Sequence, residues 1–383
     1  MRRIASLKGS ITELQKVCLS RNIAFVTFCT PGSKDIQTLI QYKSSPGTIS
    51  SLSQINFQQG FVFAPFAENR KFPVFLVKPD FIINGYAVDR NILEKLKEAD
   101  GSDKGINSAN DTIYESSKDE FLGQAELIKV GIHSGALEKA VLSRVRLVEN
   151  KGVSDVPDIF NKIIHKYPQA FRYMLNIPGA GTWTGATPEL LVEVNDNVIG
   201  TVSMAGTQKL KGIPAGKVEW QIKEKDEQKF VTKFIENHLK DFGITDYIKK
   251  GPFNQPAANL VHLKSTFSFS RSSLKEGLGK FISALHPTPS VCGSPKEEAS
   301  QFIRQLEKHE REYFTGFLGP LNIAGRSNLF VNIRCMRVLQ HQFALFAGAG
   351  ITSGSDVGNE WKETEFKMQT LLSVMYNTKT DHD

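Results

Sequence analysis

The chain has 383 residues, of which 40% are hydrophobic and 23% are charged, and its formal net charge is +7. This is the profile of a soluble globular protein, long enough for two or three domains or for one large one. No stretch approaches the roughly 18 apolar residues needed to span a bilayer, and no apolar signal core follows the two arginines near the N-terminus. We therefore expect a cytoplasmic protein that does not enter a membrane.

Charge and cysteine usage argue against two further classes of protein. The 47 Lys and Arg residues are scattered among 40 acidic residues without a long basic run, which favours a solvated surface over nucleic-acid binding. A net positive field would also attract a small dianionic substrate. The four cysteines form no C-x-x-C pair and lack zinc-ligand spacing with histidine, so we expect free thiols in a reducing compartment.

The first part of the chain carries few functional signals. Three apolar stretches have the pattern of buried strands: residues 22–28, 60–66 and 72–77. Residues 97–116 are polar, which predicts a loop or linker, and we place the main boundary there. This division gives an N-terminal part (1–115) that contributes strands to the same fold, a main domain (116–378) and a tail (379–383).

From residue 118 onward the signals are denser. Helical patterns cover residues 121–134, 157–167, 220–242 and 294–311. Asp155 is a plausible cap for the second helix, and a capping box at Ser294 opens the last one. Strand patterns cover residues 139–148, 171–177, 189–194, 198–204, 258–269, 329–338 and 342–346. Because strands and helices mix without regular βαβ alternation, we expect an α+β fold.

The helix over residues 220–242 carries two carboxylates in an unusual position. At about 100° per residue, Glu224 and Glu227 extend the apolar stripe formed by Val231 and Ile235. Buried carboxylates are costly unless they are paired or bound to a metal. Alternatively, this end of the helix protrudes and both carboxylates are solvated.

A second pair of carboxylates lies near the C-terminus, where an apolar strand, a glycine loop (348–350) and a helix follow one another. The loop could hold an anion on its backbone N–H groups. Glu360, Glu363 and Lys367 share one helix face, which could equally be ordinary surface pairing. Two such helices with oxygen ligands and no histidine favour Mg²⁺ over Zn²⁺.

Two single residues have settings that suit acid–base chemistry. Lys139 begins a largely apolar strand, where a desolvated lysine could act as a base. Glu189 precedes two leucines, and an apolar setting suits a carboxyl group that acts as general acid. A lysine at a strand end in water and a glutamate at a turn in water are the alternatives.

Taken together, a set of ordered motifs over residues 118–376 resembles the chorismate-utilising enzymes, and within them the isochorismate synthases. The motifs are LEKAVLSR (137–144), TGATPELL (184–191), SMAGT (203–207), KEKDEQ (223–228), VHLKST (261–266), ALHPTPSVCGSP (284–295), REYFTGFLG (311–319), VNIRCMRV (331–338) and GAGITSGSDVGNEWKETEFK (348–367). The resemblance implies two packed antiparallel sheets with outer helices, a fold that the family describes as α/β.

The resemblance also implies roles for individual residues. Lys139 resembles the base that activates the water attacking C2 of chorismate, and Glu189 resembles the acid that protonates the departing C4 hydroxyl. Glu227 and Glu363 resemble direct Mg²⁺ ligands, with Glu224 and Glu360 helping through water. The remaining residues resemble groups that hold the substrate or line its pocket: Arg334, Lys367, the Gly348 backbone, His262, Thr207 and Phe314.

Two departures from the family pattern stand out. Phe314 occupies the usual tyrosine position of R-x-x-Y-x-G, with Tyr313 displaced by one residue, so a hydrogen bond to a substrate carboxylate would be lost. Gln228 replaces a histidine that commonly follows the metal-binding glutamate.

Within the family, the ALHPTP segment favours isochorismate synthase over anthranilate, aminodeoxychorismate and salicylate synthases. We accordingly expect no glutaminase subunit, a monomer or weak dimer, and a place in menaquinone rather than siderophore synthesis. A catalytically inactive anion-binding homologue is the alternative from a different class of protein.

Overall fold

The structure is a computed structural model. It describes residues 8–99, 112–150, 155–210, 213–257 and 260–376, so most of the polar segment 97–116 and the tail 379–383 lie outside the described part. Two nine-stranded sheets and a short two-stranded pair, β1 (Lys8–Ser10) with β8 (Ala87–Asp89), account for the strands within these residues.

The first large sheet contains the strand that begins at Lys139, and all its paired strands are antiparallel. In spatial order its strands are β16 (Gly293–Ser294), β9 (Lys139–Glu149), β20 (Gln342–Ile351), β19 (Cys335–Val338), β11 (Gly181–Thr187), β10 (Phe171–Ile177), β2 (Ala24–Cys29), β3 (Gln37–Gln41) and β7 (Phe81–Asn84). We call it the Lys139 sheet.

The second large sheet is also antiparallel throughout, and one of its central strands starts directly after Glu189. In spatial order its strands are β14 (Tyr247–Ala257), β15 (Leu260–Ser270), β13 (Val198–Lys209), β12 (Leu190–Asn195), β18 (Ser327–Val331), β17 (Phe317–Leu321), β5 (Gly60–Ala64), β6 (Val74–Val77) and β4 (Gly47–Ile49). We call it the Glu189 sheet.

Aromatic side chains fill the space between the two sheets. Phe171 of the Lys139 sheet stacks on Phe330 of the Glu189 sheet with ring centroids 4.4 Å apart. Phe63 and Trp183, again from different sheets, meet edge to face at 6.0 Å. Such pairs add specific geometry to the area that they bury. The prediction of two packed antiparallel sheets is therefore confirmed.

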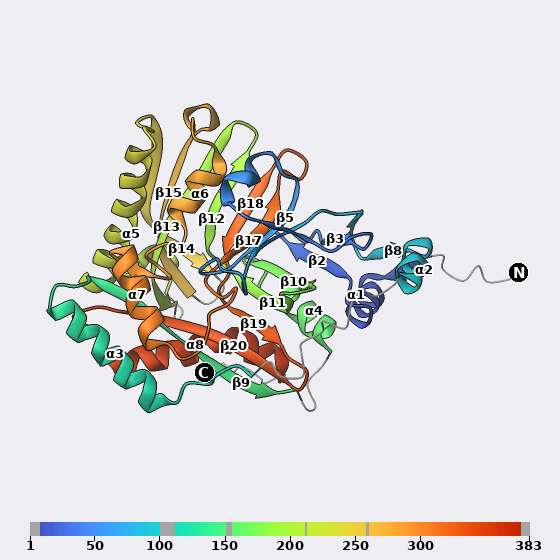
Figure 1. Cartoon of the computed structure of the whole chain (residues 1–383). Helices are drawn as coiled ribbons and strands as arrows, with labels where there is room; N and C mark the ends of the chain where they lie inside the picture. Colours follow the sequence, from blue (N-terminus) through green and yellow to red (C-terminus); the bar gives the residue numbers. More distant parts are fainter. Residues whose placement is uncertain (1–7, 100–111, 151–154, 211–212, 258–259, 377–383) are drawn as a thin grey trace, which may run out of the picture.

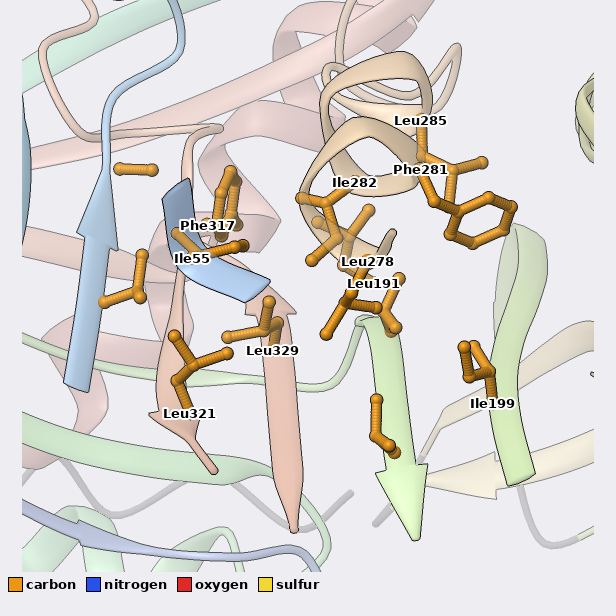
Figure 2. Close-up of a cluster of buried hydrophobic side chains, with 14 of the residues drawn as sticks. Ile55, Leu191, Ile199, Leu278, Phe281, Ile282, Leu285, Phe317, Leu321 and Leu329 are labelled. Carbon is orange, nitrogen blue, oxygen red and sulfur yellow. The ribbon is translucent and has the colours of Figure 1, made fainter. Parts of the chain in front are cut away.

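Helices cover the outer faces of both sheets (Figure 1). They are α1 (Ile11–Ser20), α2 (Arg90–Glu98), α3 (Lys118–His133), α4 (Val156–Lys166), α5 (Ile222–Asp241), α6 (Leu278–Leu285), α7 (Lys296–Leu306) and α8 (Val357–Met375). Figure 2 shows one such contact, in which the apolar side chains of α6 lie over Leu191 and Ile199 of the Glu189 sheet. Helix α5 adds Val231 and Ile235 to the same apolar cluster, as its stripe predicts.

The N-terminal strands belong to both large sheets. Strand β2 pairs with β10, and β5 pairs with β17. The predicted strands at residues 22–28, 60–66 and 72–77 thus form as β2, β5 and β6, and they extend the sheets that carry the candidate site residues.

The predicted glycine loop at residues 348–350 is wrong, because these residues continue β20. Gly348 pairs with Ser143, and Gly350 pairs with Val141, both in β9. The long partner strand provides ladder hydrogen bonds to the end of β20, which outweighs the turn preference of glycine.

Three other local predictions need correction. The stretch 329–338 divides into β18 and β19, and between them Arg334 adopts a left-handed φ of 52°. Helix α7 has Pro295 rather than Ser294 at its N-cap position and ends at Leu306, and the Ser294 hydroxyl bonds Glu138 instead. Asp155 occupies the N-cap position of α4 without a side-chain capping bond, because it pairs with Lys16. Strands β11 and β14 were not predicted.

None of the described helices combines the length and apolarity that crossing a bilayer requires.

Candidate active site

Lys139 begins β9 and is buried, with 4% of its surface exposed. Its ammonium group forms an ion pair and hydrogen bond with Oε1 of Glu227, which reaches it from α5. Gly350 lies beside it on β20, where a Cβ atom would come within 2.8 Å of the lysine Cε. A side chain at position 350 would therefore displace the end of the Lys139 side chain. A solvated lysine at a strand end is excluded.

Glu189 lies in the short connection between β11 and β12, and its backbone is held on both sides. Its N–H donates to the Thr187 hydroxyl (3.4 Å), and its carbonyl accepts from the Val331 N–H (2.9 Å). The side chain is buried, and Oε1 accepts a hydrogen bond of 2.6 Å from the Ser290 hydroxyl.

Burial raises the pKa of the Glu189 carboxyl group. The Ser290 hydrogen bond and the charges of Lys367 and Lys139 act in the opposite direction without cancelling this effect, and the charge of Glu227 adds to it. The pKa of Glu189 is thus shifted in the direction that a general acid needs.

Two further carboxylates, from different helices, face each other near this pair. Burial and the nearby charge of Glu363 raise the pKa of Glu227. The charge and hydrogen bond of Lys139 lower it by more, so that the net shift is downward. Glu363 of α8 is 44% exposed and also pairs with Lys367 at 2.6 Å. The surface pairing considered for α8 therefore exists, but it lies within reach of Glu227.

Glu224 and Glu360 lie one helical turn before these carboxylates. Glu224 Oε2 is buried and has no hydrogen-bond partner among the described residues, and the stem of this side chain lies beside Gly206. Glu360 is buried, with 3% of its surface exposed, in the first turn of α8. The alternative in which both carboxylates of α5 are solvated is therefore contradicted at this oxygen of Glu224.

Cationic groups approach the same place from the β18–β19 connection and from α8. Burial lowers the pKa of Arg334 to about 10, and the charges of Glu363 and Glu189 partly offset this effect. The Lys367 ammonium group donates a 2.6 Å hydrogen bond to the Gly348 carbonyl. Arg334 is therefore positively charged at neutral pH, and its guanidinium group and the Lys367 ammonium group could bind a carboxylate.

His262 of β15 lies close enough to respond to both cations. Burial lowers its pKa to about 4, with smaller contributions from the charges of Arg334 and Lys367. Its Nδ1 is 3.2 Å from the Gly206 carbonyl, which can only accept, so the neutral ring carries its proton there. The side chain of Thr207 lies outside the described part of the structure.

The structure places Phe314 in the core between the sheets. It is 2% exposed and stacks on Phe346 at 5.4 Å. Tyr313 does not replace the missing tyrosine hydroxyl, because its own hydroxyl donates to the Pro73 carbonyl (3.1 Å) and its ring stacks on Phe63.

Gln228 lies beneath the carboxylates of α5 and is buried. Its Nε2 donates to the Ser203 carbonyl (3.2 Å), the Ser203 hydroxyl (2.9 Å) and the Ser265 hydroxyl (3.2 Å). The substitution thus leaves a neutral amide that ties α5 to β13 and β15.

Sequence reasoning missed Ser290 as a partner of Glu189. Ser290 belongs to the ALHPTPSVCGSP motif, but it lies 101 residues from Glu189 in the chain. A hydroxyl residue within a motif is a weak signal, and its partner depends on how two distant loops meet.

Comparisons with known proteins now decide the family. The model of the family described as "Chorismate binding enzyme" matches residues 80–376, which is more than half of the chain. The chain belongs to the chorismate-binding enzymes. The resemblance inferred from the motifs is therefore confirmed.

Individual relatives agree with this family. The chain is 28% identical over 244 residues to "Isochorismate synthase EntC" of Escherichia coli (strain K12), an alignment that covers 62% of either chain. The structure resembles the putative 2,3-dihydroxybenzoate-specific isochorismate synthase DhbC of Bacillus anthracis (TM-score 0.73, 22% identity, 94% of this chain and 99% of that one). It resembles MenF, the menaquinone-specific isochorismate synthase of Escherichia coli, to the same degree (TM-score 0.73, 19% identity, 92% and 88%).

The donor set fits a hard divalent cation. Magnesium prefers oxygen ligands, and Glu227 and Glu363 present carboxylates from two helices whose charges repel each other. Glu224 Oε2, which has no partner within the described part of the chain, adds a buried acceptor on the same helix as Glu227. Among the described residues, no three acidic, histidine or cysteine side chains are spaced to enclose an ion by themselves. Substrate and water would have to complete the coordination.

Proposed function

We propose that this protein is a Mg²⁺-dependent isochorismate synthase, which adds water at C2 of chorismate and removes the C4 hydroxyl group. The observation that carries the proposal is the buried Glu189 carboxyl group, whose pKa is raised in a site that also contains Lys139. Relatives that are named isochorismate synthases, at 28% and 30% identity, support the same reaction.

The reaction needs an acid and a base at different atoms of one ring. Hydroxide is a poor leaving group, so Glu189 protonates the C4 oxygen as it departs, and water is a poor nucleophile, so Lys139 accepts its proton as it attacks C2. Lys139 lies at the start of β9, and Glu189 lies in the β11–β12 connection, so that separate segments of the chain carry the two groups.

The Arg334 guanidinium and Lys367 ammonium groups would bind one carboxylate of chorismate by charge. Both side chains are partly buried, so that little water would separate them from the substrate. Glu227 and Glu363 would hold Mg²⁺ directly, with Glu224 and Glu360 placed to act through water. The bound ion would neutralise a second substrate carboxylate. Because residues 348–350 form part of β20, Gly348 would contribute strand backbone rather than a loop.

The product decides this proposal. Purified protein incubated with chorismate and Mg²⁺, without ammonia, should release isochorismate. Anthranilate or aminodeoxychorismate formed with ammonia, or salicylate, would assign a different reaction of the family. Chorismate binding without any product would identify an inactive anion-binding homologue.

Magnesium binding can be measured without turnover. Mg²⁺ at about 100 times its dissociation constant should stabilise the fold by about 2.7 kcal/mol, seen as a rise in melting temperature. Glu363→Gln should abolish the rise, whereas Glu365→Gln, which lies on the same helix and pairs with Arg144, should keep it. An equal rise in all three proteins would remove Glu363 from the metal site.

The pathway that we propose is menaquinone synthesis. The fold is equally similar to a structure named menaquinone-specific and to one named 2,3-dihydroxybenzoate-specific, with a TM-score of 0.73 for each. A cellular experiment therefore has to distinguish the two pathways. Deletion of the gene should lower menaquinone content. Loss of a catechol siderophore with menaquinone unchanged would reverse the assignment.

A further inference from the structure

We infer that Ser290 is a positioning residue that orients the Glu189 carboxyl group, and that Thr288 fixes the direction of the Ser290 hydroxyl. This inference rests on the proposed role of Glu189 as general acid. It assigns a task in the reaction to the turn between α6 and β16.

The hydrogen-bond directions follow from counting protons. The Ser290 hydroxyl has one proton, and it donates to Glu189 Oε1 at 2.6 Å. The Thr288 and Ser290 hydroxyl oxygens are also 2.6 Å apart, so Thr288 must donate in that contact. The chain of donors runs from Thr288 through Ser290 to Glu189.

This direction determines which carboxyl oxygen carries the acid proton. An oxygen that already accepts from Ser290 is the poorer place for a proton, so the proton of neutral Glu189 lies on Oε2. Oε2 is then the atom that delivers the proton to the leaving oxygen. Without Ser290, the carboxyl group could rotate and present either oxygen.

The choice of a hydroxyl donor has a physical reason. Charged groups reach Glu189 from each neighbouring element: Lys139 from β9, Lys367 from α8, Glu227 from α5 and Arg334 from the β18–β19 connection. A cation in direct contact would hold the carboxylate ionised. A neutral hydroxyl fixes its orientation while allowing it to carry a proton.

The turn that carries Ser290 is held firmly at both ends. Lys296 donates to the His286 carbonyl at 2.5 Å, and Arg311 donates to the Val291 carbonyl at 2.8 Å. The Thr288 carbonyl accepts from the N–H groups of Val291 and Cys292. Ser290 is thus placed by buried backbone contacts rather than by its own side chain.

The same turn continues into the strand beside Lys139. The Cys292 carbonyl accepts from the Val141 N–H at 2.8 Å, and Ser294 of β16 pairs with Lys139. One segment therefore supports the proposed acid through a side chain and the proposed base through a strand pair.

Ser290→Ala tests the inference by two measurements on the full-length protein. We expect kcat for isochorismate formation to fall about tenfold with little change in KM, since a misplaced acid affects the reaction more than binding. Because the lost donor stabilised the ionised form, the alkaline limb of the kcat/KM profile should move to higher pH. Ser290→Thr, which keeps a hydroxyl, should restore most of both values.

Ser300→Ala is the matched control. Its hydroxyl contacts the Cys292 thiol at 3.3 Å and supports the same turn from α7, without a contact to Glu189. It should leave the rate and the pH limb unchanged. A wild-type rate and limb in Ser290→Ala would overturn the inference, as would an equal loss in Ser300→Ala.

Two further results keep the test decisive. If Ser290→Ala does not fold, Ser290→Cys replaces it, since a thiol is a weak donor of similar shape and should also shift the limb upward. An unshifted limb in that variant overturns the inference. Absence of isochorismate formation in the wild-type protein would instead refute the proposed function.

Discussion

Glu189 and Glu307 both have buried carboxylate groups, yet the surroundings of the two groups differ. Glu189 precedes β12, and Glu307 contacts β9. Glu307 Oε1 accepts from Arg311 (2.6 Å) and from the Ser143 N–H (2.7 Å), and Oε2 accepts from Arg311 at 2.8 Å. Glu189 has the hydroxyl group of Ser290 as its direct donor. One carboxylate is bound by a cation, and the other by a neutral group.

The two pKa shifts follow from this difference. Burial raises the pKa of Glu307, but the charge and hydrogen bonds of Arg311 outweigh it, so that the net shift is downward. For Glu189 burial is the larger effect, and the net shift is upward. Burial alone thus does not mark a functional carboxylate. Incomplete compensation by cations distinguishes the group that can donate a proton from the group that stabilises the fold.

The largest effect should be a loss of turnover at the site of Glu189, where nearby cations do not cancel the effect of burial on the pKa. Glu189→Gln and Lys139→Ala should each lower kcat at least about 10²-fold, the usual scale for acid–base residues. Neither variant should lose its fold, which circular dichroism can verify. A rate within a few-fold of wild type in either variant would remove that residue from the proposed chemistry.

Glu307, whose charge Arg311 stabilises, should matter for the stability of the fold instead. Glu307→Ala leaves the Arg311 guanidinium buried without its carboxylate, and we expect the free energy of unfolding to fall by about 3–5 kcal/mol. Glu276→Ala is the control, because Glu276 and Lys280 form an i, i+4 pair of the same spacing that is more than half exposed. It should cost less than about 1 kcal/mol. Similar losses of unfolding free energy in Glu307→Ala and Glu276→Ala, measured by urea unfolding, would contradict this difference between the buried and the exposed pair.

The smallest effect concerns pH. A raised folded-state pKa means that Glu189 favours folding below its unfolded pKa and that this contribution is lost as pH rises through the folded value. At neutral pH Glu189→Gln should therefore be at least as stable as wild type, with the advantage disappearing below the ordinary glutamate pKa of 4.5.

Glu307 should show the opposite dependence. Its lowered pKa adds stability above pH 4.5, and that stability is lost as pH falls through the folded value. Denaturant unfolding of wild type, Glu189→Gln and Glu307→Gln between about pH 2 and pH 8 would reveal both signs. A loss of stability at neutral pH in Glu189→Gln would show that Glu189 is a structural residue as well.

Much of the local structure was predictable because its signals are local. The apolar stripe of α5 and the apolar stretches of β9 and β10 gave elements that differ from the structure by few residues. The glycine stretch at 348–350 was not predictable in this way, because its conformation depends on pairing with β9, some 200 residues earlier.

By itself the sequence determined the fold class, the two carboxylate-bearing helices and the family. These properties reside in periodicity and in ordered motifs, which the chain carries regardless of its packing. Tertiary structure decided which groups meet: Lys139 contacts Glu227 from 88 residues away, and Ser290 contacts Glu189 from 101. It also decided that, among the residues that the structure describes, Glu307 contacts a cation directly and Glu189 does not. Protonation depends on such long-range neighbours, because charges act through space rather than along the chain.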